Sequence, residues 1–347
     1  MVKWKHGCLQ NIYARVRFPL APQNLFYLTL CLLLLYSSVV AITIESAPHI
    51  QEISLGTQAW RTVARVVTYP FFKRWFNHGP ESQFSRAEDL AEDGYGTVVN
   101  TSHFGKSDMP IDISRVFASP VLGRREVLLP IAIHQFKEWY VPVGRLLGIE
   151  LAPIITPDSL EYVKTHPGKE QKFMNYIKTE LLKDEERDLE ETISSRLIIT
   201  KLLRRYIDRG IVTLGRGGAV IMATQGERCA NLNPDTYTSS LSLLLGRANE
   251  VQPPLENIAV TSVGLGLRGV ITGPVRSYEG RNGYNFSKIH EVNEGSTMTK
   301  REIEKRAQEP EVIERARERK LRPVDEVGYE ELARIVPLAY LSQEPAA

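Results

Sequence analysis

His103 and Asp108 are the residue types that acid–base chemistry needs, and they lie five positions apart. A histidine accepts a proton near neutral pH, and a carboxylate at this spacing can hold the imidazole in the tautomer whose free nitrogen does so. Val98 and Val99 precede the pair and Pro110 follows it, which predicts that the pair lies where a strand ends and a helix begins. The spacing alone is more typical of a structural pair, so a second motif has to decide.

The second motif, at residues 218–229, is an apolar strand that runs into a short polar turn. Together the two motifs resemble the glycerolipid acyltransferases, in which an H-x-x-x-x-D motif is followed by a strand ending in F-P-E-G-T-R. Matched by register, Gln225, Gly226 and Arg228 stand at the family's glutamate, glycine and arginine. The strand expected at residues 258–264 resembles the family's fourth block, and the resemblance covers about residues 85–290.

The resemblance implies a membrane-associated O-acyltransferase of phospholipid biosynthesis. Such an enzyme moves a fatty acyl group from acyl-CoA or acyl carrier protein to a hydroxyl of a glycerolipid or lysophospholipid. His103 would be the general base, and Asp108 would orient its imidazole and stabilise the charge on it. No metal and no cofactor beyond the acyl carrier is implied.

The resemblance also implies a set of substrate-binding residues. These are Lys106, Gln225, Gly226 and Arg228. Arg228 and Lys106 would hold a phosphate, and backbone N–H groups near Gly226 would meet the developing oxyanion. The family's second block ends in an arginine that is thought to hold the acceptor's phosphate, whereas here Ala152 and Pro153 stand near that place.

Three other functions compete with acyl transfer. A membrane lipid-binding protein on the same fold, inactive or weakly active, is suggested by Gln225 and by the missing second-block arginine. A hydrolase would use water as the acceptor, but the sequence has no G-x-S-x-G motif. An oxidoreductase is suggested by the G-x-G-x-x-G pattern at residues 264–269, which β-branched residues and a proline follow instead of a helix start.

Composition narrows the class of protein further. The net charge of +2, from 43 basic and 41 acidic residues, gives no global field that would attract nucleic acid. The three cysteines are far apart and odd in number, which argues against a disulfide scaffold. The seven histidines form no cluster with metal-ligand spacing, so we expect no metal site.

A membrane anchor is predicted at residues 25–44, which contain no charged residue and match the length of a bilayer-spanning helix. A basic tail, residues 1–24, precedes this segment. The alternative is a cleaved signal peptide, but a 24-residue leader is long for one. We therefore expect a transmembrane or signal-anchor helix.

Residues 56–80 are expected to form an amphipathic interfacial segment, because aromatic and aliphatic residues alternate there with basic ones. Arg61 and Arg65 would face anionic lipid, and Pro70 would introduce a kink. The alternative is an amphipathic helix that packs on the domain itself.

The expected location is the membrane, with the catalytic domain on the cytoplasmic face, because acyl thioesters are cytoplasmic. The four basic residues before the anchor slightly favour a cytoplasmic N-terminus, which for a single pass would place the domain outside. A re-entrant pair made of residues 25–44 and 56–77 would reconcile the two expectations.

The order of elements predicts an α/β fold with a mixed, partly parallel central sheet flanked by helices. The acyltransferase domain is expected at residues 81–298, with a helical insertion at about 157–209 that could cover the acyl site. The charged residues 299–347 are expected to form a helical C-terminal extension, in which residues 299–322 form an exposed helix or pair of helices.

Overall fold

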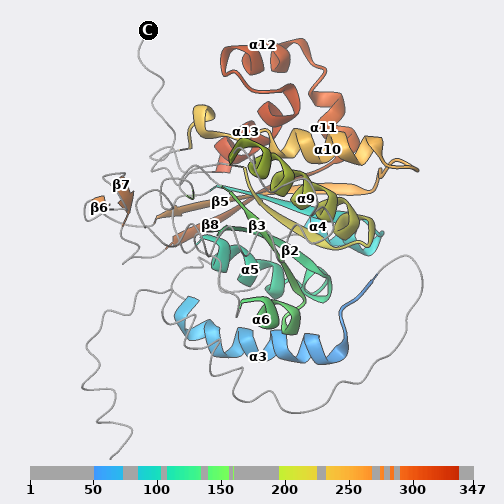
Figure 1. The fold of residues 1–347 in the computed structure, drawn as a ribbon, viewed down its shortest axis with the longest axis vertical. Helices are drawn as coiled ribbons and strands as arrows, with labels where there is room; N and C mark the ends of the chain where they lie inside the picture. Colours follow the sequence, from blue (N-terminus) through green and yellow to red (C-terminus); the bar gives the residue numbers. More distant parts are fainter. Residues whose placement is uncertain are drawn as a thin grey trace, which may run out of the picture.

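The computed structural model describes residues 51–72, 85–102, 108–133, 140–155, 159, 195–224, 232–267, 274–276, 282–284 and 290–335 (Figure 1). In this part of the chain a mixed, mostly parallel sheet of six strands lies between two layers of helices. The fold is therefore α/β, as the sequence predicts.

The sheet has the strand order β3-β2-β4-β1-β5-β8, and β8 alone is antiparallel to its neighbour. Its strands are β1 (Gly96–Thr101), β2 (Val127–Ala132), β3 (Ile149–Ile154), β4 (Ala219–Ala223), β5 (Ile258–Leu267) and β8 (His290–Thr299). A separate two-stranded sheet pairs β6 (Pro274–Arg276) with β7 (Asn282–Tyr284).

We call the face of the sheet that bears Val99 the lower face and the face that bears Val98 the upper face, as they appear in Figure 1. The lower face carries α3 (Leu55–Phe72), α4 (Ser85–Glu92), α5 (Asp108–Ala118) and α6 (Tyr140–Leu146). The upper face carries α9 (Ser195–Gly215), α10 (Ser240–Glu250), α11 (Lys300–Arg306), α12 (Pro310–Glu318) and α13 (Pro323–Ile335). Two 3-10 turns, η2 (Leu122–Arg124) and η5 (Pro234–Thr236), complete the described elements.

The alternation along β1 explains the two layers. Val98 and Val99 are both fully buried, and each belongs to a different apolar cluster. Strands covered on both faces are apolar throughout instead of alternating with polar residues, which is typical of parallel sheets. Strand β4 lies within residues 218–229, as expected, and β5 begins at the expected Ile258 but continues beyond residue 264 to Leu267.

Helix α3 packs on the domain through Arg61, which is 2% exposed. Its guanidinium donates hydrogen bonds to the carbonyls of Leu147 (2.6 Å), Gly123 (2.7 Å), Arg125 (2.8 Å) and Gly148 (3.0 Å). Burial lowers the pKa of Arg61 to about 9, so the group remains cationic at neutral pH. The expectation that Arg61 faces anionic lipid is therefore wrong, because four backbone acceptors inside the protein attract it more strongly than the surface.

Gly148 makes this contact possible. Its φ of +60° is a conformation that other residues adopt with strain, and a β-carbon there would lie 2.8 Å from the Arg61 guanidinium. The turn between α6 and β3 can thus close around the arginine only with glycine at this position.

The charged C-terminal region forms α11, α12 and α13, and much of it is buried. Arg306 binds Glu330 (2.6 Å) and Glu331 (2.5 Å), and Arg315 binds Glu330 (2.6 Å). Glu326, which is fully buried, is paired with Arg319. Residues 301–322 include many exposed charged positions on α11 and α12, whereas acidic residues of α13 are buried because arginines that precede this helix pair with them.

The expected membrane anchor at residues 25–44 lies outside the described residues, as does most of the expected insertion. Within the described ranges, no helix combines the length and apolar character needed to cross a bilayer. The expected insertion boundary at residue 209 falls inside α9, which crosses from β3 to β4.

Candidate functional site

Strands β1 and β4 form a topological switch point. They are adjacent and parallel, with Thr101 paired to Ala223 at their carboxyl ends. The chain leaves β1 through α5 on the lower face, toward β2, and leaves β4 through α10 on the upper face, toward β5. In open α/β sheets, neighbouring connections that diverge in this way leave a crevice beyond the strand ends, which is the common place for a ligand.

The first motif follows β1, and residues 225–228 of the second motif follow β4. Residues 103–107 lie between the end of β1 and the start of α5, and Gln225 comes directly after Thr224 at the end of β4. Because parallel strands end at the same edge of the sheet, both segments begin at this edge, each after one of two adjacent strands. The fold thus brings together two strand ends that are more than 100 residues apart in the sequence.

A buried polar cluster lies directly beneath this edge. The amide oxygen of Asn100 accepts hydrogen bonds from Thr224 (2.6 Å) and Tyr237 (3.4 Å). Its amide nitrogen donates to the Gly328 carbonyl (3.2 Å) and the Ser262 hydroxyl (3.4 Å). All four hydrogen-bonding positions of the amide are therefore used inside the protein.

We call Asn100, Thr224, Tyr237, Ser262 and Gly328 the Asn100 cluster. It links the carboxyl end of β1 (Asn100) and the residue after β4 (Thr224) to β5 and to α13. Burial raises the pKa of the Tyr237 hydroxyl well above its usual value, so this group remains a neutral donor. A buried network with every group satisfied fixes one arrangement of its strands.

Gly328 lets α13 reach the cluster. A β-carbon at this position would lie 2.7 Å from Leu241 and 2.8 Å from the Tyr237 hydroxyl. The helix approaches the sheet closely because this residue has no side chain, and its carbonyl can then accept from Asn100.

The start of α5 is tied to the end of β1 on the lower face. Thr101 donates a hydrogen bond from its hydroxyl to the carboxylate of Asp112 (3.3 Å), one helical turn beyond Asp108. Asp112 is 1% exposed, and Arg115 nearby is 4% exposed with a pKa that burial lowers to about 10. The five residues between Ser102 and Asp108 are therefore held at both ends.

The sheet opens on the other side of β4. Strand β2 pairs with β4 only at Val127 and Leu128, and in this register the next N–H to bond the Ile221 carbonyl would belong to Pro130, which has none. The hydroxyl of Tyr206, from α9, donates to that carbonyl instead (3.0 Å). The hydroxyl replaces the missing ladder bond and lets β2 diverge from β4 toward the carboxyl edge.

The strands that precede the predicted site residues end at this edge. Asp108 is the first residue of α5, and nothing is described of its side chain. The other predicted site residues fall outside the described part of the chain, and they are His103, Lys106, Gln225, Gly226 and Arg228. The structure fixes the strand ends and the helix start from which they extend.

Sequence reasoning did not single out the residues of the Asn100 cluster. The available signal was an asparagine at the end of an otherwise apolar strand, three positions before a histidine. A buried amide needs partners, so this residue already predicts polar groups on the neighbouring strands.

The described residues also bear on the rival functions. Gly264 and Gly266 lie inside β5 and pair with β8, not at a turn before a helix, so the arrangement that binds a dinucleotide is missing there. Among the described residues, no three His, Cys, Asp or Glu side chains are grouped to hold a metal ion.

Comparison of the chain with models of known protein families gives no match, and comparison with curated proteins gives none either. The functional conclusion therefore depends on the motifs, the strand ends that carry them and the Asn100 cluster.

Proposed function

We propose that this protein is a membrane-associated O-acyltransferase of the glycerolipid acyltransferase type. The observation that carries the proposal is that the two motif segments leave adjacent parallel strands at a switch point of the sheet. A chance pair of His and Asp has no reason to follow one of these strands while the second motif follows its neighbour.

In the proposed reaction, His103 takes the proton from a hydroxyl of the acceptor lipid. The hydroxyl oxygen then attacks the carbonyl carbon of the acyl thioester, and the carbon–sulfur bond breaks to release the carrier thiol. Asp108 holds the imidazole and stabilises its positive charge until the proton passes to the leaving sulfur. Backbone N–H groups in the turn at Gly226 stabilise the oxyanion, a contribution of about 3 kcal/mol per donor.

Phosphate recognition is assigned to Arg228 and Lys106, which follow β4 and β1. Arg145, a possible substitute for the missing second-block arginine, lies on α6 beside β3. Three strand spacings, about 14 Å, separate β3 from β1, so Arg145 is distant from this crevice.

The proposal includes an N-terminal membrane helix at residues 25–44 and a helical insertion before α9 that covers the acyl chain. The described half of α3 supports contact with a bilayer, because its only charged residue, Arg61, points into the domain. Its exposed residues are Leu55, Gly56, Ala59, Thr62 and Val63. We infer that this uncharged face lies along the lipid surface on the cytoplasmic side.

The decisive experiment replaces His103 by Ala and by Asn in the full-length protein in detergent micelles. Transfer from acyl-CoA or acyl carrier protein to a panel of lysolipids and glycerol 3-phosphate should fall by about two to four orders of magnitude. The acyl-transfer activity of Asp108→Asn should fall by a smaller factor. Asp93→Asn, at an exposed aspartate after α4, is the control and should keep full activity. Retained turnover in His103→Ala with an unchanged melting temperature would refute the mechanism.

The second candidate is a lipid-binding protein without catalysis on the same fold, favoured by Gln225 at the family's glutamate. It predicts binding of lysolipid by the wild type with no transfer from any donor. It also predicts that Gln225→Glu leaves this lack of activity unchanged, whereas an impaired enzyme would gain turnover.

A further inference from the structure

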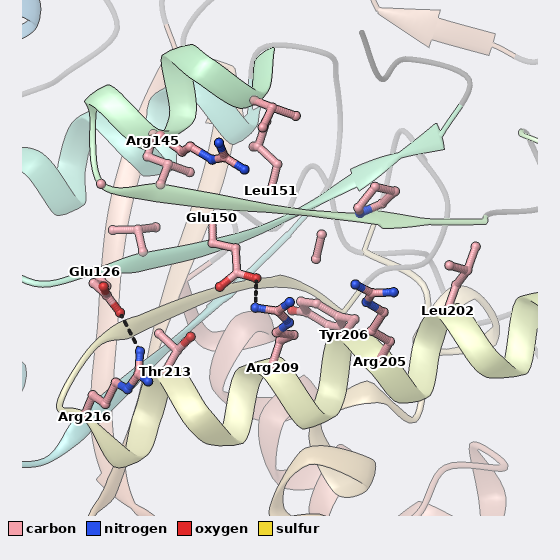
Figure 2. A pocket seen from close by; sticks show the side chains of 16 residues that line it. Glu126, Arg145, Glu150, Leu151, Leu202, Arg205, Tyr206, Arg209, Thr213 and Arg216 are labelled. Carbon is pink, nitrogen blue, oxygen red and sulfur yellow. Dashed lines mark ion pairs between the residues drawn. The ribbon is translucent and has the colours of Figure 1, made fainter. Parts of the chain in front are cut away.

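A groove runs along the outer edge of the sheet, between β3 and α9 (Figure 2). Its volume is about 520 Å³, which is within the usual range for small-molecule pockets. It is separate from the switch point, because β2 and β4 lie between β3 and β1.

Arginines dominate the charge of this groove. Four arginines and two glutamates line it, which leaves an excess of two positive charges. The arginines are Arg145 from α6 and Arg205, Arg209 and Arg216 from α9. In Figure 2 the three from α9 project toward β3 along one side of the helix.

The two glutamates each engage one arginine. Glu150 is 2.8 Å from Arg209, and Glu126 is 3.8 Å from Arg216. Arg145 is exposed and makes no ion pair with another described residue. An exposed pair of this kind contributes little stability, so an anion can compete for the guanidinium groups.

Apart from Thr213 and the Tyr206 hydroxyl, the remaining side chains that line the groove are apolar. Ile149, Leu151 and Leu202 line it, and Tyr206 is buried with its hydroxyl bonded to Ile221. Pro153 stands on the open edge of β3 and has no N–H to offer another strand, which disfavours an added peptide strand. The groove suits an elongated molecule that carries anionic groups on a less polar body.

We propose that this groove binds the phosphorylated nucleotide end of a coenzyme A thioester, an inference that rests on the proposed acyl transfer. Arginine forks match phosphate oxygens in two-point contacts, and Arg145 and Arg209 approach the groove from different helices. Pro153 and Leu202 line its carboxyl end, from which the β1 end is about 14 Å away across three strand spacings. An extended pantetheine arm has a comparable length.

Two features favour a small soluble ligand. A concave space of about 520 Å³ holds a nucleotide, whereas a protein carrier would need a broad surface. The groove also lies at the edge of the sheet between α6 and α9, and none of its lining residues comes from α3, whose uncharged face we assign to the bilayer. Lipid headgroups at α3 would thus meet residues outside the groove.

The test measures coenzyme A binding by calorimetry with the full-length protein in detergent micelles. Arg145→Gln and Arg209→Gln should each weaken binding by roughly tenfold, since each removes a charge-assisted contact to phosphate. Arg204→Gln is the matched control, because Arg204 is exposed on the same helix and does not line the groove. Glu150→Gln should tighten binding, because it removes a negative charge and frees Arg209.

A wild type that does not bind coenzyme A, or Arg145→Gln and Arg209→Gln variants that bind it as the control does, would overturn the proposal. Loss of binding to phosphatidylglycerol vesicles with coenzyme A binding unchanged would overturn it in favour of a lipid site. The two proposals fail separately. His103→Ala should retain coenzyme A binding, and the groove variants should raise the KM for acyl-CoA with kcat nearly unchanged.

Discussion

Helices α3 and α12 lie at opposite ends of the long axis of the molecule (Figure 1) and present opposite surfaces to their surroundings. The exposed residues of the described half of α3 carry no charge. Those of α12 are mostly charged, and they are Pro310, Glu311, Ile313, Glu314, Arg317 and Glu318. One end is suited to a lipid surface and the other to water.

The two ends also bury their inner charges differently. Arg61 of α3 is satisfied by four backbone carbonyls and has no hydrogen-bonded carboxylate partner among the described residues. The C-terminal helices pair Arg306 and Arg315 with Glu330 and Glu331. A guanidinium held by carbonyls leaves its helix free of counter-charges, and this is why the outer face of α3 can be uncharged.

The largest effect on this comparison is expected from Arg61→Met. The substitution leaves four carbonyl groups without their donor, and it should lower the free energy of unfolding by about 3 to 5 kcal/mol. Chemical denaturation measures this value. Thr62→Met, at the exposed neighbouring position, should change it little. Similar losses for both variants would mean that Arg61 does not hold α3 to the domain.

A smaller loss is expected at the other end from Arg306→Met. It breaks the contacts to Glu330 and Glu331, but each glutamate keeps a second arginine, so about 1 to 3 kcal/mol should be lost. Arg317→Met removes an exposed pair with Glu314 and should stay within about 0.5 kcal/mol. If the two variants lost the same free energy of unfolding, the ion-pair network would contribute no more to stability than a surface pair does.

The stability contributed by the C-terminal helices should depend on pH through Asp325 of α13. Burial raises the pKa of Asp325 above its usual value, against hydrogen bonds from Ser242 that lower it. The folded state then binds this proton more tightly than the unfolded chain, so the carboxyl favours folding less as pH rises through the folded pKa. Asp325→Asn should therefore be more stable relative to the wild type at pH 7 than at about pH 4. Thermal melts at both values measure this, and the opposite trend would contradict the sign.

The smallest effect on stability is expected from Val63→Glu, on the exposed face of α3. Val63 is 42% exposed, so the free energy of unfolding should change by less than about 0.5 kcal/mol. Binding of the full-length protein to phosphatidylglycerol vesicles should fall, because a charge enters the uncharged face. Ile313→Glu on α12, where Ile313 is 39% exposed, should leave vesicle binding unchanged. If both variants reduced vesicle binding equally, α3 and α12 would not differ in their contact with lipid.

The sequence predicts strands β4 and β5 because each begins with an apolar run. Strand β4 lies within residues 218–229, and β5 begins at Ile258, where the strand at residues 258–264 is expected. The sequence places each motif at the end of an apolar strand, and the structure pairs those two strands, β1 and β4, in parallel.

Other features depend on contacts that no local pattern contains. Arg61 resembles a surface arginine in the sequence, and only the carbonyls contributed by η2 and the α6–β3 turn make its burial favourable. Glu326 lies in a run of charged residues, yet it is buried because its carboxylate pairs with Arg319. The amide of Asn100 likewise needs groups from β4, β5 and α13. The contacts of Arg61 and Asn100 join residues distant in sequence, and the pair of Arg319 with Glu326 joins two different helical segments.

The exchange of a ladder hydrogen bond for the Tyr206 hydroxyl links two positions 76 residues apart in the sequence. Proline at position 130 removes an N–H, and tyrosine at 206 supplies the replacement donor. A chain that regained an N–H at 130 would no longer need the hydroxyl, whereas a chain that lost the hydroxyl alone would bury an unpaired carbonyl. The two positions should therefore change together, and the pair keeps this edge of the sheet open.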